Sequence, residues 1–130
     1  MLLFGHRFIA SERFYHIEDI AAILHTPANA LLYVVFDENH LDILNHLQHN
    51  ALRFAVDVRS VRELIYAENF GAAYIMLSTS LAKEAQNIAE TYLFDAKIIA
   101  RIDDERDIET MAYEGIDGVA FPEAVIRVSA

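Results

Sequence analysis

Side chains that can move protons or bind anions come directly after several apolar runs of this chain. They are carboxylates, guanidinium groups and hydroxyls at Asp37, Asp57, Arg59, Ser78, Thr79, Arg101 and Asp103, with Glu38 and Asp104 beside two of them. A guanidinium presents a fork of N–H donors to a carboxylate or phosphate, and neighbouring carboxylates can do acid–base chemistry. The same residue types also cap helices and stabilise their first turns, so a purely structural role is the alternative.

The apolar runs alternate with amphipathic segments of helical length, which is the pattern of βα units. Strands are predicted at 31–36, 52–58, 73–77, 96–102 and 118–121, and helices at 39–49, 60–69, 79–94 and 105–114. Ser60 and Glu63 have the spacing of a capping box, and Ser80 or Thr79 can cap the third of these helices. The uninterrupted apolar character of 31–36 indicates a strand that is covered on both faces.

The N-terminal segment is less regular. Residues 2–4 and 7–10 fit either one strand kinked at Gly5 or two separate pieces, and 16–24 predicts a short helix that ends before Pro27. The whole pattern predicts an α/β fold with three layers, Rossmann-like or flavodoxin-like, in which helices cover both faces of a mostly parallel sheet of about six strands. Because ligands of such sheets bind beyond the carboxyl ends of the strands, we expect the seven residues named first to line one ligand site.

Composition limits the partners and the compartment. The chain has 130 residues and no linker rich in Gly, Ser or Pro, so a single domain over 1–130 is expected. A formal net charge of −10 makes it an acidic protein and argues against nucleic acid as a partner. The hydrophobic share of 55% and the mean hydropathy of +0.21 favour a protein partner or a homodimer. The longest apolar stretch, 30–36, is too short for membrane insertion, and the lack of a leader predicts a cytoplasmic protein.

Several common chemistries lack a candidate motif. The chain has no cysteine, no Gly-x-Ser-x-Gly, no Gly-Lys-Ser/Thr loop and no His-Glu-x-x-His. Asp42, His46 and His49 have a spacing that could present metal ligands, but they lie opposite the leucines of the predicted helix, where polar residues are ordinarily solvated. No metal site or catalytic residue is therefore predicted, and a cofactor is left open.

The C-terminal third carries a family resemblance. Residues 97–107 read Lys-Ile-Ile-Ala-Arg-Ile-Asp-Asp-Glu-Arg-Asp, and 115–123 read Gly-Ile-Asp-Gly-Val-Ala-Phe-Pro-Glu. This ending resembles that of the regulator-of-potassium-conductance (RCK, or TrkA-N-like) domains, Rossmann-type nucleotide-binding regulators of potassium channels and transporters. The resemblance implies a ribose-binding role for Asp37 and places the turn 78–80 near the nucleotide. In the stretch 5–10, where the family has its phosphate-binding glycines, only Gly5 and Ala10 fit, and Arg7 occupies a position where a side chain would collide with the diphosphate.

A second, shorter resemblance concerns a barrel fold. Residues 114–119 are similar to the last unit of glycerophosphodiester phosphodiesterase barrels, and His6-Arg7 resembles their His-Arg opening. A full (β/α)₈ barrel takes about 200 residues or more, so the length of this chain argues against a closed barrel.

Three hypotheses about function follow from these patterns. The first is a small regulatory or protein-interaction module, supported by the high apolar content. The second is a nucleotide or small-metabolite sensor that binds at the carboxyl ends of the strands, with Asp37 holding a ribose and Arg7 or Arg101 meeting an anion. The third is an enzyme of unknown reaction that uses Asp57 for acid–base chemistry and Arg101 as an anion clamp.

Overall fold

One parallel sheet of short strands forms the centre of the structure, a computed structural model that describes residues 1–129. The strands are β1 (Leu2–Phe4), β2 (Phe14–His16), β3 (Leu31–Val35), β4 (Phe54–Asp57), β5 (Tyr74–Ser78), β6 (Lys97–Arg101), β7 (Gly118–Ala120) and β8 (Val125–Arg127). Their order is β1-β7-β6-β5-β4-β3-β2-β8, and every neighbouring pair is parallel. The carboxyl ends of the strands therefore lie at one edge of the sheet, and their amino ends lie at the other.

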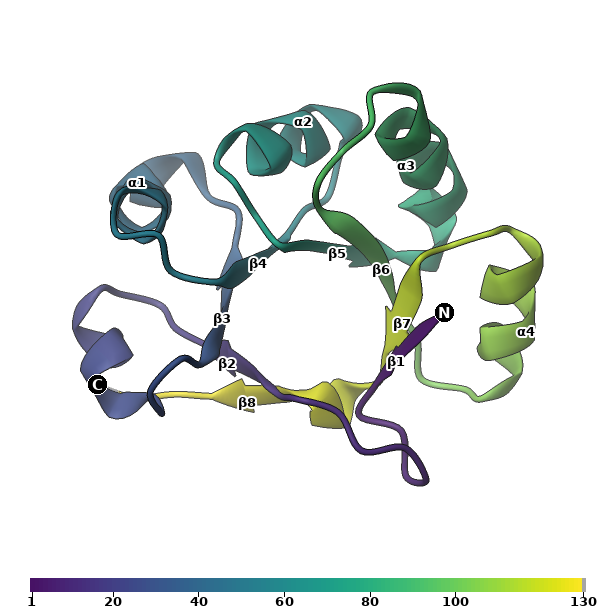
Figure 1. Cartoon of the computed structure of the whole chain (residues 1–130), viewed down its shortest axis with the longest axis horizontal. Helices are drawn as coiled ribbons and strands as arrows, with labels where there is room; N and C mark the ends of the chain where they lie inside the picture. Colours follow the sequence, from purple (N-terminus) through teal and green to yellow (C-terminus); the bar gives the residue numbers. More distant parts are fainter. Residues whose placement is uncertain (130) are drawn as a thin grey trace.

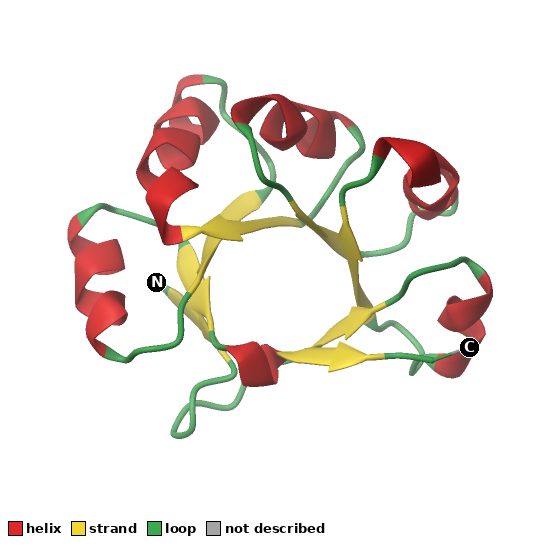
Figure 2. Ribbon diagram, turned by 180° about the vertical axis from the view of Figure 1, so that it is seen from behind, coloured by secondary structure: helices red, strands yellow, loops and turns green. Residues whose placement is uncertain are grey.

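The sheet curls into an incomplete barrel, and the helices surround it on the outside (Figure 1). The α-helices are α1 (Leu41–His49), α2 (Val61–Asn69), α3 (Thr79–Thr91) and α4 (Arg106–Tyr113), and the 3₁₀ helices are η1 (Ala21–His25), η2 (Glu38–His40) and η3 (Pro122–Ala124). Seen from behind, the strands again form the ring and the α-helices its outer layer (Figure 2).

Local sequence explains where the helices begin. Ser60 caps α2 by accepting a hydrogen bond from the Glu63 N–H at 3.2 Å, while a Glu63 carboxylate oxygen accepts the Arg59 N–H at 2.9 Å. This confirms the predicted Ser60 cap. The N-cap of α3 is Ser78, without a side-chain cap bond, so the prediction that Thr79 or Ser80 caps this helix is wrong.

Alternation along the strands divides the apolar side chains between two cores. Between the sheet and the helices lie residues such as Leu32, Val56, Ile75 and Ile98. The concave side is filled by a separate cluster: Phe4, Phe14, Leu31, Tyr33, Ala55, Met76, Ile99, Ala120 and Ala124. Because side chains fill both faces, the strands read as continuous apolar runs although helices cover only one face.

Aromatic rings dominate the concave core on one side. The Phe14 ring lies 4.8 Å from Phe4, 5.9 Å from Tyr74 and 6.2 Å from Tyr33, measured between ring centroids. Small residues face them from other elements, since Ala55, Ala120 and Ala124 belong to the same cluster. Large and small side chains thus complement each other within a ring of small radius.

Several details of the predicted fold are wrong. The sheet has eight strands instead of about six, and its helices lie on the convex face instead of on both faces. His16 ends β2, and the predicted helix 16–24 is replaced by the 3₁₀ helix η1. Residues 7–10 form no strand, and β8 follows Pro122, where the sequence predicts no further strand. The eight strands fit into so short a chain because each has only three to five residues.

The edge strands β1 and β8 do not pair, and η3 packs against the end of β1 instead. The Phe121 N–H donates to the Phe4 carbonyl at 3.0 Å, and Ala124 is fully buried. Gly5 has φ +74°, and a Cβ placed there would lie 2.7 Å from the Ala124 backbone nitrogen. The backbone at Gly5 can therefore approach η3 only because the residue has no side chain.

We expect Gly5→Ala to destabilise the protein more than Gly115→Ala. Both glycines have a positive φ, +74° and +73°, but no atom lies within 4 Å of a Cβ placed at Gly115. Gly115→Ala thus costs only the conformational term of about 1 kcal/mol. Gly5→Ala adds the collision with Ala124, for a total loss of about 2 to 3 kcal/mol in urea unfolding. Equal losses for the two variants would contradict the close packing of η3 on β1.

Candidate functional site

The concave side of the sheet carries charged side chains at the carboxyl ends of two of its strands, β4 and β6. Ala55 belongs to the concave core and Val56 to the outer core, so the alternation turns Asp57 toward the concave side. Ile99 and Ala100 are divided in the same way, which turns Arg101 inward at the end of β6. The fold therefore brings two of the predicted site residues together.

Tyr33, Asp57 and Arg101 form a connected network at this end. Asp57 is only 8% exposed, and one carboxylate oxygen, Oδ2, accepts a hydrogen bond from the Tyr33 hydroxyl. Its Oδ1 accepts a hydrogen bond from Arg101 Nη1 at 2.5 Å. Both carboxylate oxygens are thus engaged, and the pair fixes the position of the guanidinium.

Arg101 keeps donors for a further partner. Its guanidinium donates through Nη1 to Asp57 and also interacts with the Tyr33 hydroxyl, which together engage fewer than half of its N–H donors. The side chain is 42% exposed, so a molecule from solvent can reach these donors. An arginine held on one side and open on the other is suited to bidentate recognition of a carboxylate or phosphate.

A small cavity lies beside Arg101. It has a volume of about 250 Å³ and is lined by Arg101, Asp103, Met76, Phe121 and Val125 among others. We call it the Arg101 cavity. It combines two charged residues with an apolar wall, which is the usual construction of a small-ligand site.

His16 lies on the other side of Tyr33. The two rings meet edge to face, with centroids 5.1 Å apart. Burial lowers the pKa of His16, against the opposing effect of Glu18, and so favours a neutral imidazole. Burial also raises the pKa of Tyr33 far above its usual value, and the Asp57 carboxylate adds to this rise. Tyr33 is therefore a hydrogen-bond donor and not an anion at neutral pH.

The lowered pKa of His16 predicts a loss of stability on mild acidification. The unfolded chain, with a histidine pKa of about 6.5, takes up the proton first as the pH falls. The stability that His16 contributes is therefore present above that value and is lost between it and the lower pKa of the folded state. Urea unfolding at several pH values should show a smaller acid loss for His16→Gln than for the unchanged protein. Identical losses would contradict the burial of this imidazole.

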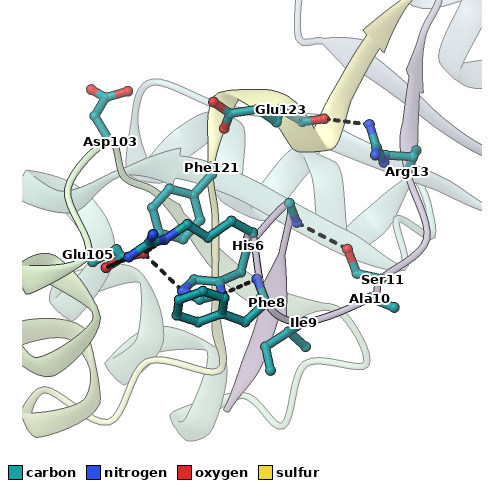
Figure 3. Close-up of a pocket in the computed structure, with 12 residues that line it drawn as sticks. His6, Phe8, Ile9, Ala10, Ser11, Arg13, Asp103, Glu105, Phe121 and Glu123 are labelled. Carbon is teal, nitrogen blue, oxygen red and sulfur yellow. Dashed lines mark hydrogen bonds and ion pairs between the residues drawn. The ribbon is translucent and has the colours of Figure 1, made fainter.

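A loop at the carboxyl end of β1 forms a second, larger cavity of about 760 Å³ (Figure 3). Residues 5–11 and Arg13 line it together with Asp103, Glu105, Phe121 and Glu123. Arg7 donates to both carboxylate oxygens of Glu105, at 2.8 and 3.3 Å, and its guanidinium carbon lies 4.4 Å from the centre of the Phe8 ring. These contacts attach the loop to the start of α4, and the Arg7 pair lowers the pKa of Glu105.

His6 is fully engaged within this loop. Its Nδ1 accepts the Phe8 N–H at 3.0 Å, and its Nε2 lies 3.3 Å from Glu105 Oε1. With one nitrogen accepting and the other beside a carboxylate, neither is left to take a proton from a substrate in this geometry. The His6-Arg7 pair is therefore a tether of the loop in this structure.

Two other predicted residues lie in a separate groove. Asp37 and Arg59 line a cavity of about 390 Å³ beyond the ends of β3 and β4, together with His16 and Glu18. Asp37 Oδ1 accepts the Asn39 N–H at 2.9 Å, which is a helix-capping bond at η2. The hypothetical site is thus divided: Asp57, Arg101 and Asp103 belong to one region, and Asp37 and Arg59 to another.

The two hydroxyl residues predicted for the site, Ser78 and Thr79, lie at the start of α3. Ser78 pairs in register with Arg101, and its Oγ lies 2.9 Å from the Ser80 Oγ. Thr79 is the first residue of α3. Both positions fit the structural role that helix starts give to such residues.

Tyr33, His16 and Glu105 also belong to the carboxyl-end region, and none of them was among the predicted site residues. Tyr33 could have been found, because it is the one polar-tipped residue in the run 31–36 and shares a strand face with Leu31. Glu105 and His16 gave no comparable signal, since their roles depend on which loops meet in space. Within residues 1–129, no group of three or more histidines or acids is placed to hold a metal ion.

Fold and site together define an α/β protein with a curled parallel sheet and a polar carboxyl end. No protein-family model and no curated protein matches this chain. None of the helices within residues 1–129 is long and apolar enough to cross a membrane.

Proposed function

We propose that this protein is a small-metabolite-binding domain that holds the anionic group of its ligand on Arg101, at the carboxyl end of the sheet. One observation carries the proposal: Arg101 is held by Asp57, keeps further donors, and lines the Arg101 cavity. Because Asp57 already holds the Arg101 guanidinium in place, this side chain loses little conformational entropy when a ligand binds to it. This favours ligand binding over a merely structural ion pair.

The position of the cavity supports the same function. In parallel α/β folds, ligands bind beyond the carboxyl ends of the strands. The Arg101 cavity lies at that end, beside the end of β6 and the residues that follow β7. An acidic chain that directs an arginine into a cavity there is arranged for a specific anion, since its net charge of −10 opposes unspecific anion binding.

A thermal-shift series tests this function. Acetate, pyruvate and inorganic phosphate are added to the protein, with sodium chloride at equal ionic strength as the control for screening. A bound anion at about 100 times its dissociation constant adds roughly 2.7 kcal/mol of stability. We expect at least one of these anions to raise the melting temperature beyond chloride.

Matched variants connect the shift to Arg101. Lys97 and Arg101 lie at opposite ends of β6, so Lys97→Gln removes the same charge far from the cavity and should keep the shift. Arg101→Gln should abolish it, and Arg101→Lys should weaken it because a lysine keeps the charge beside Asp57 but loses the fork. Circular dichroism confirms that each variant is folded. An equal shift in Arg101→Gln would refute the function.

Nucleotide binding of the RCK type remains a separate hypothesis. It uses Asp37 as the ribose-binding acid, and Asp37 lines the groove beyond β3 and not the Arg101 cavity. Adding NAD and ATP to the same series tests it. A shift that is lost in Asp37→Ala and kept in Arg101→Gln would favour this family function.

A homodimeric interaction module is the second candidate. Exposed apolar side chains favour it: Leu93, just after α3, is 84% exposed, and Tyr113, the last residue of the neighbouring helix α4, is 91% exposed. Light scattering after size exclusion should then give twice the chain mass, and Leu93→Asp should reduce it to one. A monomer in both samples would exclude this dimer.

A further inference from the structure

We propose that the ligand of the Arg101 cavity is a small zwitterion, an α-amino acid with an apolar side chain. This inference rests on the proposed function and names the class of its ligand. The Arg101 cavity contains one positive residue, Arg101, and one negative residue, Asp103, and the rest of its lining is apolar. An α-amino acid has the complementary set: a carboxylate for the arginine, an ammonium group for the aspartate, and an apolar side chain for the wall.

The backbone places the two charges on the same side. Arg101 ends β6, and the Ile102 N–H donates to the Ala120 carbonyl at 2.9 Å, so the extended chain continues beyond the strand. Ile102 is packed in the outer core. Arg101 and Asp103 both line the cavity, Arg101 at the end of β6 and Asp103 in the bend that follows Ile102.

Asp103 differs from the two acids that follow it. Asp104 pairs with Arg106 at 2.6 Å, and Glu105 pairs with Arg7 at 2.8 Å. Among residues 1–129, Asp103 has no cationic partner, and in Figure 3 its carboxylate extends away from the Arg7–Glu105 pair. The carboxylate in the cavity wall is therefore the one that an ammonium group can still neutralise.

The volume limits the size of the ligand. About 250 Å³ is below the range of about 300 to 1,000 Å³ that is usual for drug-sized ligands. A free amino acid fits such a space, whereas most of a dinucleotide would lie outside it. Met76, Phe121 and Val125 supply the apolar wall, which favours a side chain such as that of valine over a charged one.

The test uses three molecules that differ by one charged group. L-valine has both charges, 3-methylbutanoate lacks the ammonium group, and 2-methylpropan-1-amine lacks the carboxylate. Calorimetric titration of the unchanged protein should give a dissociation constant for valine at least roughly tenfold below that for 3-methylbutanoate, as a charged hydrogen bond implies. The amine should bind weakest, because it cannot use the Arg101 fork.

A variant pair assigns the ammonium group to Asp103. In Asp103→Asn, the preference for valine over 3-methylbutanoate should disappear while 3-methylbutanoate still binds. Asp104→Asn removes the adjacent carboxylate, which pairs with Arg106, and should keep the preference. Equal binding of valine and 3-methylbutanoate to the unchanged protein would overturn the zwitterion but leave the anion site intact. Binding of neither molecule, together with no shift by phosphate, would refute both proposals.

Discussion

Replacing Phe14 with alanine is expected to lower the free energy of unfolding by about 3 to 5 kcal/mol. Phe14 is 0% exposed, and its ring contacts the rings of Phe4, Tyr33 and Tyr74 in the concave core. The four α-helices lie on the other face of the sheet, so none of them can move inward to fill the cavity that the lost ring would leave (Figure 1). Urea unfolding followed by far-ultraviolet circular dichroism measures the loss.

Phe8→Ala is the matched control for Phe14→Ala. Phe8 is 71% exposed on the loop 5–13, and its loss should change stability by about 0.5 kcal/mol or less. If Phe14→Ala does not fold, Phe14→Leu should still show a loss of about 1 to 2 kcal/mol. Equal effects at positions 8 and 14 would mean that the concave side is not a packed core.

Replacing Asp57 with alanine should cost about 2 to 3 kcal/mol. The variant leaves the buried Tyr33 hydroxyl without its acceptor and Arg101 without its counter-charge. We expect less than the full cost of breaking a buried ion pair, because Arg101 is 42% exposed and water can solvate it. Urea unfolding at neutral pH measures this loss.

A double variant separates the two contributions. Tyr33→Phe removes the stranded hydroxyl, so Tyr33→Phe combined with Asp57→Ala should lose less than the sum of the two single variants. Strict additivity would show that Tyr33 and Asp57 do not act as a unit. Asp104→Ala, which breaks an exposed pair with Arg106, should have a much smaller effect than Asp57→Ala.

The βα units from Leu31 onward were predictable because each one is locally complete. The Ser60 cap, the apolar strand runs and the turn glycines act within a few residues of one another. The curling of the sheet into an incomplete barrel was not predictable in this way. It depends on Gly5 meeting Ala124, residues that lie far apart in the sequence, and on side chains that fill the concave face instead of helices.

The same distinction applies to the candidate site. Parallel strands with a common direction were enough to predict that Asp57 and Arg101 lie at one edge. The curvature of the sheet determines which of these residues are in contact. It brings Asp57 and Arg101 together across β5, whereas Asp37 and Arg59 lie in a different groove. Neither the radius of the sheet nor the partner of Tyr33 is encoded in any local pattern.

The most direct test of the anion site observes Arg101 itself. In a ¹H–¹⁵N spectrum, the Arg101 Nε–H signal is assigned by its absence in Arg101→Gln. Titration with acetate should shift this signal in a saturable way, together with the amides of residues 101–103, 120 and 121, because these residues line the cavity. An Arg101 signal that does not move with acetate, phosphate or valine would contradict the account.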